Sequence, residues 1–158
     1  MTTFNREQYL GEIAELLARA KANLKDQAPE AIIYTLNVWT DPDAAASAVS
    51  FDTKLSSDHM IAFQNRRFGE QNSLRGRIQN PADFAYSGIA ECVHSSIPQS
   101  WGEESKGGCW DILEPVLLEV RDMARREFSG LPLDEAAELS VNSRRDWYDH
   151  SCCIGSDL

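Results

Sequence analysis

Cysteine and histidine side chains are considered first, because both bind metals and serve as nucleophile or base in catalysis. Cys92 and His94 are separated by one residue, and so are His150 and Cys152. On a β-strand such pairs share a face, so these four side chains are chemically adequate ligands for zinc. Neither pair has a usual zinc-site spacing, and the alternative is that Cys92 and Cys109 are buried apolar thiols. We favour this alternative and predict no metal.

Cys109 is the best candidate for a nucleophile, because it lies just before a long predicted helix whose N-terminal dipole would lower the pKa of its thiol. His94 or His150 could then act as its base, which would make the protein a small cysteine-dependent hydrolase. The other interpretation is that Cys109 packs beside Trp110. The sequence contains none of the nucleotide-binding, serine-hydrolase or zinc-protease motifs. We therefore predict no catalytic residues and no cofactor, and a non-enzymatic protein as the main hypothesis.

Tryptophan next to carboxylates, in polar segments, indicates protein binding instead. Tryptophan and tyrosine are frequent anchors of interfaces, and surrounding carboxylates favour a basic partner. The other interpretation is that each ring closes an edge of the core. The predicted partner-binding residues are Trp39, Asp41 and Asp43, then Trp101, Glu103 and Glu104, and finally Asp146, Trp147 and Asp149.

The charge distribution agrees with a basic partner. The 158 residues include 15 Lys and Arg against 25 Asp and Glu, a net charge of -10. Residues 1–79 hold 9 basic and 10 acidic residues, whereas residues 80–158 hold 6 and 15, so the second half carries -9. This excess disfavours nucleic acid and anionic membranes, which bind surplus cations. It favours encounter with a basic protein, or it serves solubility alone.

Length and composition predict one soluble domain. A chain of 158 residues with 42% hydrophobic and 25% charged residues has globular composition. No apolar run approaches the ~18–20 residues of a membrane helix, and the first residues lack the pattern of a signal peptide. We therefore expect a cytoplasmic protein with reduced cysteines, and a mobile tail over about the last six residues. The oligomeric state is left open.

Periodicity predicts the elements that position these residues. Two long helices have one apolar stripe each, and a strand–turn–strand segment with Asp41-Pro42-Asp43 at its centre predicts an antiparallel hairpin. The fold class expected is α+β, with an antiparallel sheet of few strands packed on the two helices. The predicted elements are helices at 6–24 and 111–128, strands at 32–39 and 46–53, a short helix at 133–139 and a short edge strand at 139–142.

Two stretches resemble a family of small bacterial proteins of uncharacterised function. Residues 33–41 are similar to a strand ending in a Tyr-Thr-x-Asp-like turn, and residues 80–86 to a segment written SPAEWAYE before a long helix. Here Phe84 replaces the tryptophan and Ser87 the acidic residue. Such proteins look like immunity proteins or accessory proteins of bacterial toxin systems. The resemblance implies a protein that binds and neutralises a cognate toxin by occluding it, and it implies no catalytic residues.

Overall fold

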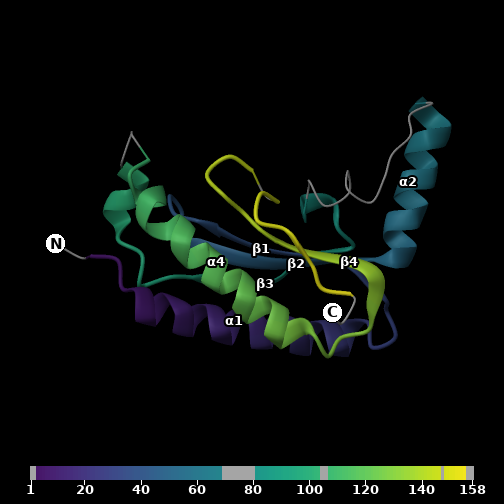
Figure 1. The fold of residues 1–158 in the computed structure, drawn as a ribbon, viewed down its shortest axis with the longest axis horizontal. Helices are drawn as coiled ribbons and strands as arrows, with labels where there is room; N and C mark the ends of the chain where they lie inside the picture. Colours follow the sequence, from purple (N-terminus) through teal and green to yellow (C-terminus); the bar gives the residue numbers. More distant parts are fainter. Residues whose placement is uncertain (1–2, 69–80, 104–106, 147, 156–158) are drawn as a thin grey trace.

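The computed structural model describes residues 3–68, 81–103, 107–146 and 148–155. Its strands form one sheet in the order β3-β2-β1-β4-β5, and α1 and α4 lie side by side on one face of it (Figure 1). This arrangement confirms the predicted α+β class. The helices are α1 (Arg6–Gln27), α2 (Lys54–Phe68) and α4 (Cys109–Phe128), with 3-10 turns η1 (Pro81–Asp83) and η2 (Gln99–Glu103); the strands are β1 (Ile33–Asp41), β2 (Ala46–Thr53), β3 (Tyr86–Val93), β4 (Leu133–Val141) and β5 (Cys152–Cys153).

Helix α1 begins directly after its capping residue, Asn5. The Asn5 side-chain oxygen accepts a hydrogen bond from the Gln8 amide at 3.1 Å, which satisfies one of the unpaired donors of the first turn. The whole predicted stripe is buried against the sheet and α4: Tyr9, Ile13, Leu16, Leu17, Ala20 and Leu24. Two polar side chains of α1 also cap the outer edge of β3. Arg19 donates to the Glu91 carbonyl at 3.0 Å, and Asn23 donates to the Ile89 carbonyl at 2.9 Å.

Helix α4 covers the other half of the same face, over β4 and β1. Its apolar stripe is buried at Leu113, Val116, Leu117, Val120 and Ala124, whereas Met123 is partly buried and Ile112 is exposed. The helix starts at Cys109, two residues earlier than predicted, so Pro115 lies in its second turn. Apolar side chains from both helices and from the facing side of β1, β2 and β4 make up the core.

Strand β4 corrects the prediction for residues 133–142. These residues form one strand and no helix, and the strand lies inside the sheet between β1 and β5, not at its edge. It runs parallel to β1, with Leu36 opposite Leu139 and Val38 opposite Val141, so one pair of an otherwise antiparallel sheet is parallel. Its sequence, Leu-Asp-Glu-Ala-Ala-Glu-Leu, favours a helix locally, but pairing with β1 overrides this weak preference.

Part of the expected C-terminal tail belongs to the sheet. Cys152 and Cys153 pair with β4, and the Ile154 amide donates to the Ala137 carbonyl at 2.9 Å. Ile154 is buried in the core cluster. The remaining residues of that predicted tail, 156–158, lie outside the described residues. Helix α2 follows β2 and stands away from the two-helix layer at the far end of the molecule (Figure 1).

Candidate functional site

The ends of β1 and β4 define the candidate site. Because these two strands are parallel, their last residues meet at the same edge of the sheet, and this edge is a frequent place for binding sites. The first residues of α4 and the segment after β4 also reach this edge and enclose a cavity of about 230 Å³. The cavity is lined by Trp39, Thr40, Asp41, Pro42, Trp110, Asn142, Ser143, Arg144, Arg145 and Asp146.

Asn142 fixes the floor of this cavity. Its side-chain oxygen accepts a hydrogen bond from the Thr40 amide at 2.9 Å, and its side-chain nitrogen donates to the Thr40 carbonyl at 2.9 Å. The amide group therefore continues the ladder between β1 and β4 one residue beyond the last backbone pair, Val38 and Val141. Since Asn142 is buried and makes both bonds, the two strand ends are held at a fixed separation.

The segment after β4 is folded tightly around Ser143. The Ser143 amide donates to the Asp146 carbonyl at 2.8 Å, while its hydroxyl accepts from the Arg145 amide at 3.0 Å and donates to Asp149 at 2.8 Å. Asp149 also accepts from the Arg145 guanidinium at 3.1 Å. The hydrogen bond from Ser143 and the contact with Arg145 together lower the pKa of Asp149. The turn therefore presents its side chains to the cavity in a defined arrangement.

The carboxylates that line the cavity are held by backbone amides. Asp41 accepts from the amides of Asp43 at 2.9 Å and Ala44 at 3.3 Å, which closes the β1–β2 turn. Asp146 accepts from the Tyr148 amide at 3.1 Å. Arg144, in contrast, makes no hydrogen bond or ion pair within the described part of the chain.

The structure brings most of the predicted binding residues to this end of the molecule. Trp39, Asp41 and Asp146 line the cavity, and Asp149 holds Arg145 at its rim. The turn η2 lies against the β1–β2 turn, because a Cβ atom on Gly102 would be 2.9 Å from the Asp43 carbonyl oxygen. The exposed Glu103 follows Gly102 directly.

Three of the predicted binding residues do not form part of this surface in the described structure. The Trp101 side chain is 5% exposed and stacks on Phe4 with ring centroids 5.0 Å apart, so it is part of the core and not a surface anchor. Glu104 and Trp147 lie outside the described residues. Two residues that the sequence did not single out as a binding pair, Trp110 and Arg144, line the cavity.

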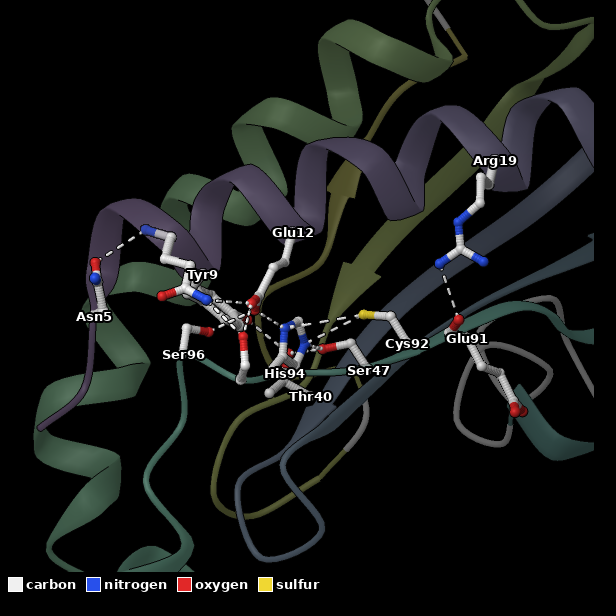
Figure 2. Close-up of polar contacts among 12 residues, drawn as sticks. Asn5, Tyr9, Glu12, Arg19, Thr40, Ser47, Glu91, Cys92, His94 and Ser96 are labelled. Atoms are coloured by element: carbon white, nitrogen blue, oxygen red, sulfur yellow. Dashed lines mark hydrogen bonds and ion pairs between the residues drawn. The ribbon is translucent and has the colours of Figure 1, made fainter. Parts of the chain in front are cut away.

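The histidine considered for catalysis belongs to a buried chain of hydrogen bonds (Figure 2). His94 Nδ1 lies 2.7 Å from Glu12 and must carry the proton, because a carboxylate only accepts. When the ring is neutral, Nε2 then accepts from the Ser47 hydroxyl at 2.6 Å. Ser47 in turn accepts from Thr40 at 2.6 Å, and Thr40 accepts from Tyr9 at 2.7 Å. Every hydroxyl in this chain donates once.

The order of Glu12, His94 and Ser47 is that of a catalytic triad, but the burial of His94 and Ser47 favours a structural role. His94 is 2% exposed and Ser47 is 1% exposed, between the sheet and α1, where no substrate can contact the hydroxyl. Burial lowers the pKa of His94, and the hydrogen bond with Glu12 offsets this only partly. The neutral imidazole therefore links helix α1 to the strand ends.

The cysteine hydrolase considered as the alternative finds no support in these contacts. Cys109 is the first residue of α4, as the hypothesis required, but its side chain is buried in the core cluster. Both ring nitrogens of His94 are engaged by Glu12 and Ser47, and His150 Nε2 lies 3.3 Å from Glu114.

The four residues considered for zinc also do not converge. Cys92 Sγ lies 3.6 Å from His94 Nε2, but Cys92 is on β3 and Cys152 is on β5, at opposite edges of the sheet. Among the residues that the structure describes, no group of three or more His, Cys, Asp or Glu side chains is arranged to hold a metal.

The second face of the sheet is a feature that the sequence interpretation missed. Thr35, Asn37 and Asp52 are fully buried there although they are polar, and Asn37 donates to the Ser140 hydroxyl at 2.9 Å. Asp52 accepts from the Ala85 amide at 2.9 Å and from the Ser57 hydroxyl. The alternation of polar residues along 33–39 was the available signal. These contacts hold β1, β2 and β4 together opposite the helices.

Comparison with models of known protein families, with curated proteins and with solved structures finds no match to this chain. Within the described residues, no helix combines the length and the apolar character that crossing a bilayer requires.

Proposed function

We propose that this protein is a non-enzymatic binding protein that neutralises a basic partner protein by occluding it, as an immunity protein occludes its toxin. The observation that carries the proposal is the convergence of separately predicted acidic and aromatic segments at one end of the fold. We call this surface the acidic end. It consists of Trp39, Asp41, Asp43, Glu103, Trp110, Asp111, Asp146 and Asp149.

The charge of the acidic end supports a basic partner. Six carboxylates lie there against the two guanidinium groups of Arg144 and Arg145, and Arg145 is already paired with Asp149. Such a surplus attracts a basic protein over a distance of about one Debye length, roughly 8 Å at physiological salt and about 30 Å at 0.01 M. Asp43 and Glu103 are exposed and so contribute most directly to this field.

The geometry of the acidic end also supports binding. Trp39 and Trp110 are half-buried, so much of their rotational freedom is lost before a partner arrives. The strand ends beneath them are fixed by Asn142, and the 143–149 turn by Ser143. A surface that is ordered in advance loses little entropy on binding, which suits occlusion of a toxin site.

The test starts with isolation of the partner and ends with binding kinetics. Proteins that co-purify at low salt from the cells that make the chain are identified, and the purified candidate is titrated with the wild-type protein. The first variant, Asp43→Lys/Glu103→Lys, reverses two exposed charges of the acidic end. The matched control, Asp122→Lys/Glu135→Lys, reverses two exposed charges elsewhere. Asp122 lies eleven residues after Asp111, about 16 Å further along α4.

We expect the acidic-end variant to slow association at least about tenfold at low salt, because steered association depends on charge near the interface. The control should change the rate by less than about threefold, since it alters the net charge equally but away from the interface. The wild-type rate should fall as salt is added. Equal slowing by both variants would show that only net charge matters and would refute this docking surface. A purified partner whose toxic activity persists in the complex would refute neutralisation.

A further inference from the structure

The cavity at the end of β1 and β4 combines aromatic walls with a cation that has no partner among the described residues. Trp39 and Trp110 line it from two different elements, and Pro42 adds a further apolar surface. Arg144 lines the same cavity and makes no hydrogen bond or ion pair with any residue in the described ranges. From this combination we infer that the cavity binds a small planar ligand that carries an anionic group, such as an aromatic phosphate or carboxylate.

The backbone leaves room for the exposed side chain of Arg144. Gly107 has a φ of 66° and faces the guanidinium, because a Cβ atom at this glycine would lie 3.0 Å from Arg144 Nη2. A side chain at position 107 would therefore be strained and would also push the guanidinium away. Gly107 precedes the first turn of α4, so the positive end of the helix dipole lies on the same side as Arg144.

An anion fits the other charges of the cavity better than a cation does. The carboxylates of Asp41 and Asp146 already accept hydrogen bonds from backbone amides, so part of their hydrogen-bonding capacity is used within the protein. Arg145 is paired with Asp149. Among the four charged side chains that line the cavity, Arg144 is therefore the one that makes neither a hydrogen bond nor an ion pair in the described structure. A guanidinium presents a planar set of donors that matches phosphate and carboxylate oxygens.

The walls of the cavity favour a flat ligand. An indole ring stacks on another planar ring in offset or edge-to-face geometry, and both tryptophans are half-buried and so restricted in motion. A cavity of about 230 Å³ has room for a single aromatic ring with one small charged group. The floor, made by Asn142 and Thr40, is held by two hydrogen bonds and does not need to move.

This inference goes beyond the proposed partner and can be tested without one. Three probes share a phenyl ring and differ in charge: phenyl phosphate, benzyl alcohol and benzylamine. Each is titrated into the whole protein while the indole N–H signals are followed by NMR, with signals assigned from single Trp→Phe variants. We expect phenyl phosphate to shift the signals of Trp39 and Trp110 saturably in the millimolar range and to leave that of the buried Trp101 in place.

Variants then test the role of the cation. Arg144→Gln should weaken the affinity for phenyl phosphate at least about tenfold, because a charge-assisted hydrogen bond is lost. The affinity for benzyl alcohol should stay unchanged. The matched control is Arg126→Gln, which removes an exposed arginine in the last turn of α4 and should change nothing. Gly107→Ala should weaken the affinity for phenyl phosphate as well. A thermal melt shows whether each variant is folded.

Three results would overturn the inference. Tighter binding of benzylamine than of phenyl phosphate would make the cavity a cation site. Equal affinity of phenyl phosphate for the wild type and for a folded Arg144→Gln variant would remove the guanidinium from the site. Absence of a saturable shift up to about 10 mM would mean that the cavity does not bind such ligands. The acidic end shares Trp39, Asp41, Trp110 and Asp146 with the cavity, but its own test relies on Asp43 and Glu103, which do not line the cavity.

Discussion

Replacing Glu12 by alanine should lower the free energy of unfolding by about 2–3 kcal/mol, because its carboxylate is the acceptor at the end of the buried chain. It accepts from His94 at 2.7 Å, Ser96 at 2.6 Å and Ser95 at 3.0 Å. Ser95 is exposed and can bond to water instead. The only other acceptor near the His94 N–H in the described structure is the Cys92 sulfur at 3.9 Å, which accepts weakly, and a buried donor without a good partner costs about 1–3 kcal/mol.

The assay is urea unfolding followed by circular dichroism, with Glu15→Ala as the matched control. Glu15 lies on the same helix, is exposed, and makes no hydrogen bond or ion pair within the described residues, so its removal should change stability by less than about 0.5 kcal/mol. Imidazole nitrogen NMR should find the proton of His94 on Nδ1. If Glu12→Ala costs no more than Glu15→Ala, or if the proton is on Nε2, then the chain is assigned wrongly.

The same chain of hydrogen bonds predicts how the free energy of unfolding depends on pH. Burial holds the pKa of His94 below its ordinary value of 6.5, so the unfolded chain binds its proton first as pH falls. The contribution of His94 to the free energy of unfolding is therefore present above pH 6.5. It is lost below that pH, by at most about 1.4 kcal/mol per pH unit. Although burial opposes ionisation of Glu12, hydrogen bonds from Ser96, His94 and Ser95 lower its pKa below 4.5. A second loss therefore follows below that pH, and Glu12→Ala should abolish only this second loss.

Three further predictions concern packing and hydrogen bonding. Leu117→Ala should cost about 2–5 kcal/mol in urea unfolding, because Leu117 is buried against the sheet, whereas the exposed neighbour Leu118→Ala should cost under about 1 kcal/mol. Thr35→Val should raise the unfolding free energy by up to about 1 kcal/mol, since the buried Thr35 hydroxyl has no hydrogen-bond partner among the described residues. Arg19→Ala should cost about 0.5–1.5 kcal/mol and speed amide exchange in β3, because it frees the Glu91 carbonyl.

Local patterns were sufficient to predict α1 from the sequence. Its cap, Asn5, and all six buried positions follow from contacts within one or two helical turns, which the sequence contains directly. The same holds for the β1–β2 hairpin, because Asp41 closes its turn with bonds to residues two and three positions later. Elements whose stabilising contacts lie close in sequence are predictable in this way.

Strand β4 was not predictable, because its partner lies about 100 residues earlier in the chain. Local propensity favoured a helix for residues 133–139, and only the pairing with β1 makes them a strand. Strand β1 also differs from what its sequence pattern predicts. An irregularity between Ile33 and Thr35 shifts the register of β1, so that Ile33 joins the core. The neighbouring Tyr34 is half-exposed, and Lys54 Nζ lies 4.7 Å from the centroid of its ring. Strict alternation would place Tyr34 on the same face as Leu36 and Val38.

The candidate site was predictable from the sequence in part: its residues could be singled out as candidates, but their assembly could not. Residue types and neighbouring charges identified Trp39, Asp41 and Asp146, but their assembly into one cavity depends on the parallel pairing of β1 and β4. Residue type cannot show whether a tryptophan in a polar segment is exposed. Trp101 is flanked by Ser100 and Gly102, yet stacking on Phe4 places it in the core.

Thr40 connects the cavity to the buried chain. Its backbone amide and carbonyl are both bonded by Asn142 at the cavity floor, and its hydroxyl lies between Tyr9 and Ser47 in the chain that ends at Glu12. A strand end is normally the part of a strand most free to fray, because its outer groups lack ladder partners. Here the last residues of β1 are held from both sides, by an amide that extends the ladder and by hydroxyls that anchor it to α1. Polar residues buried at this position therefore keep the surface around Trp39 and Asp41 in one conformation, which is what binding without an induced rearrangement requires.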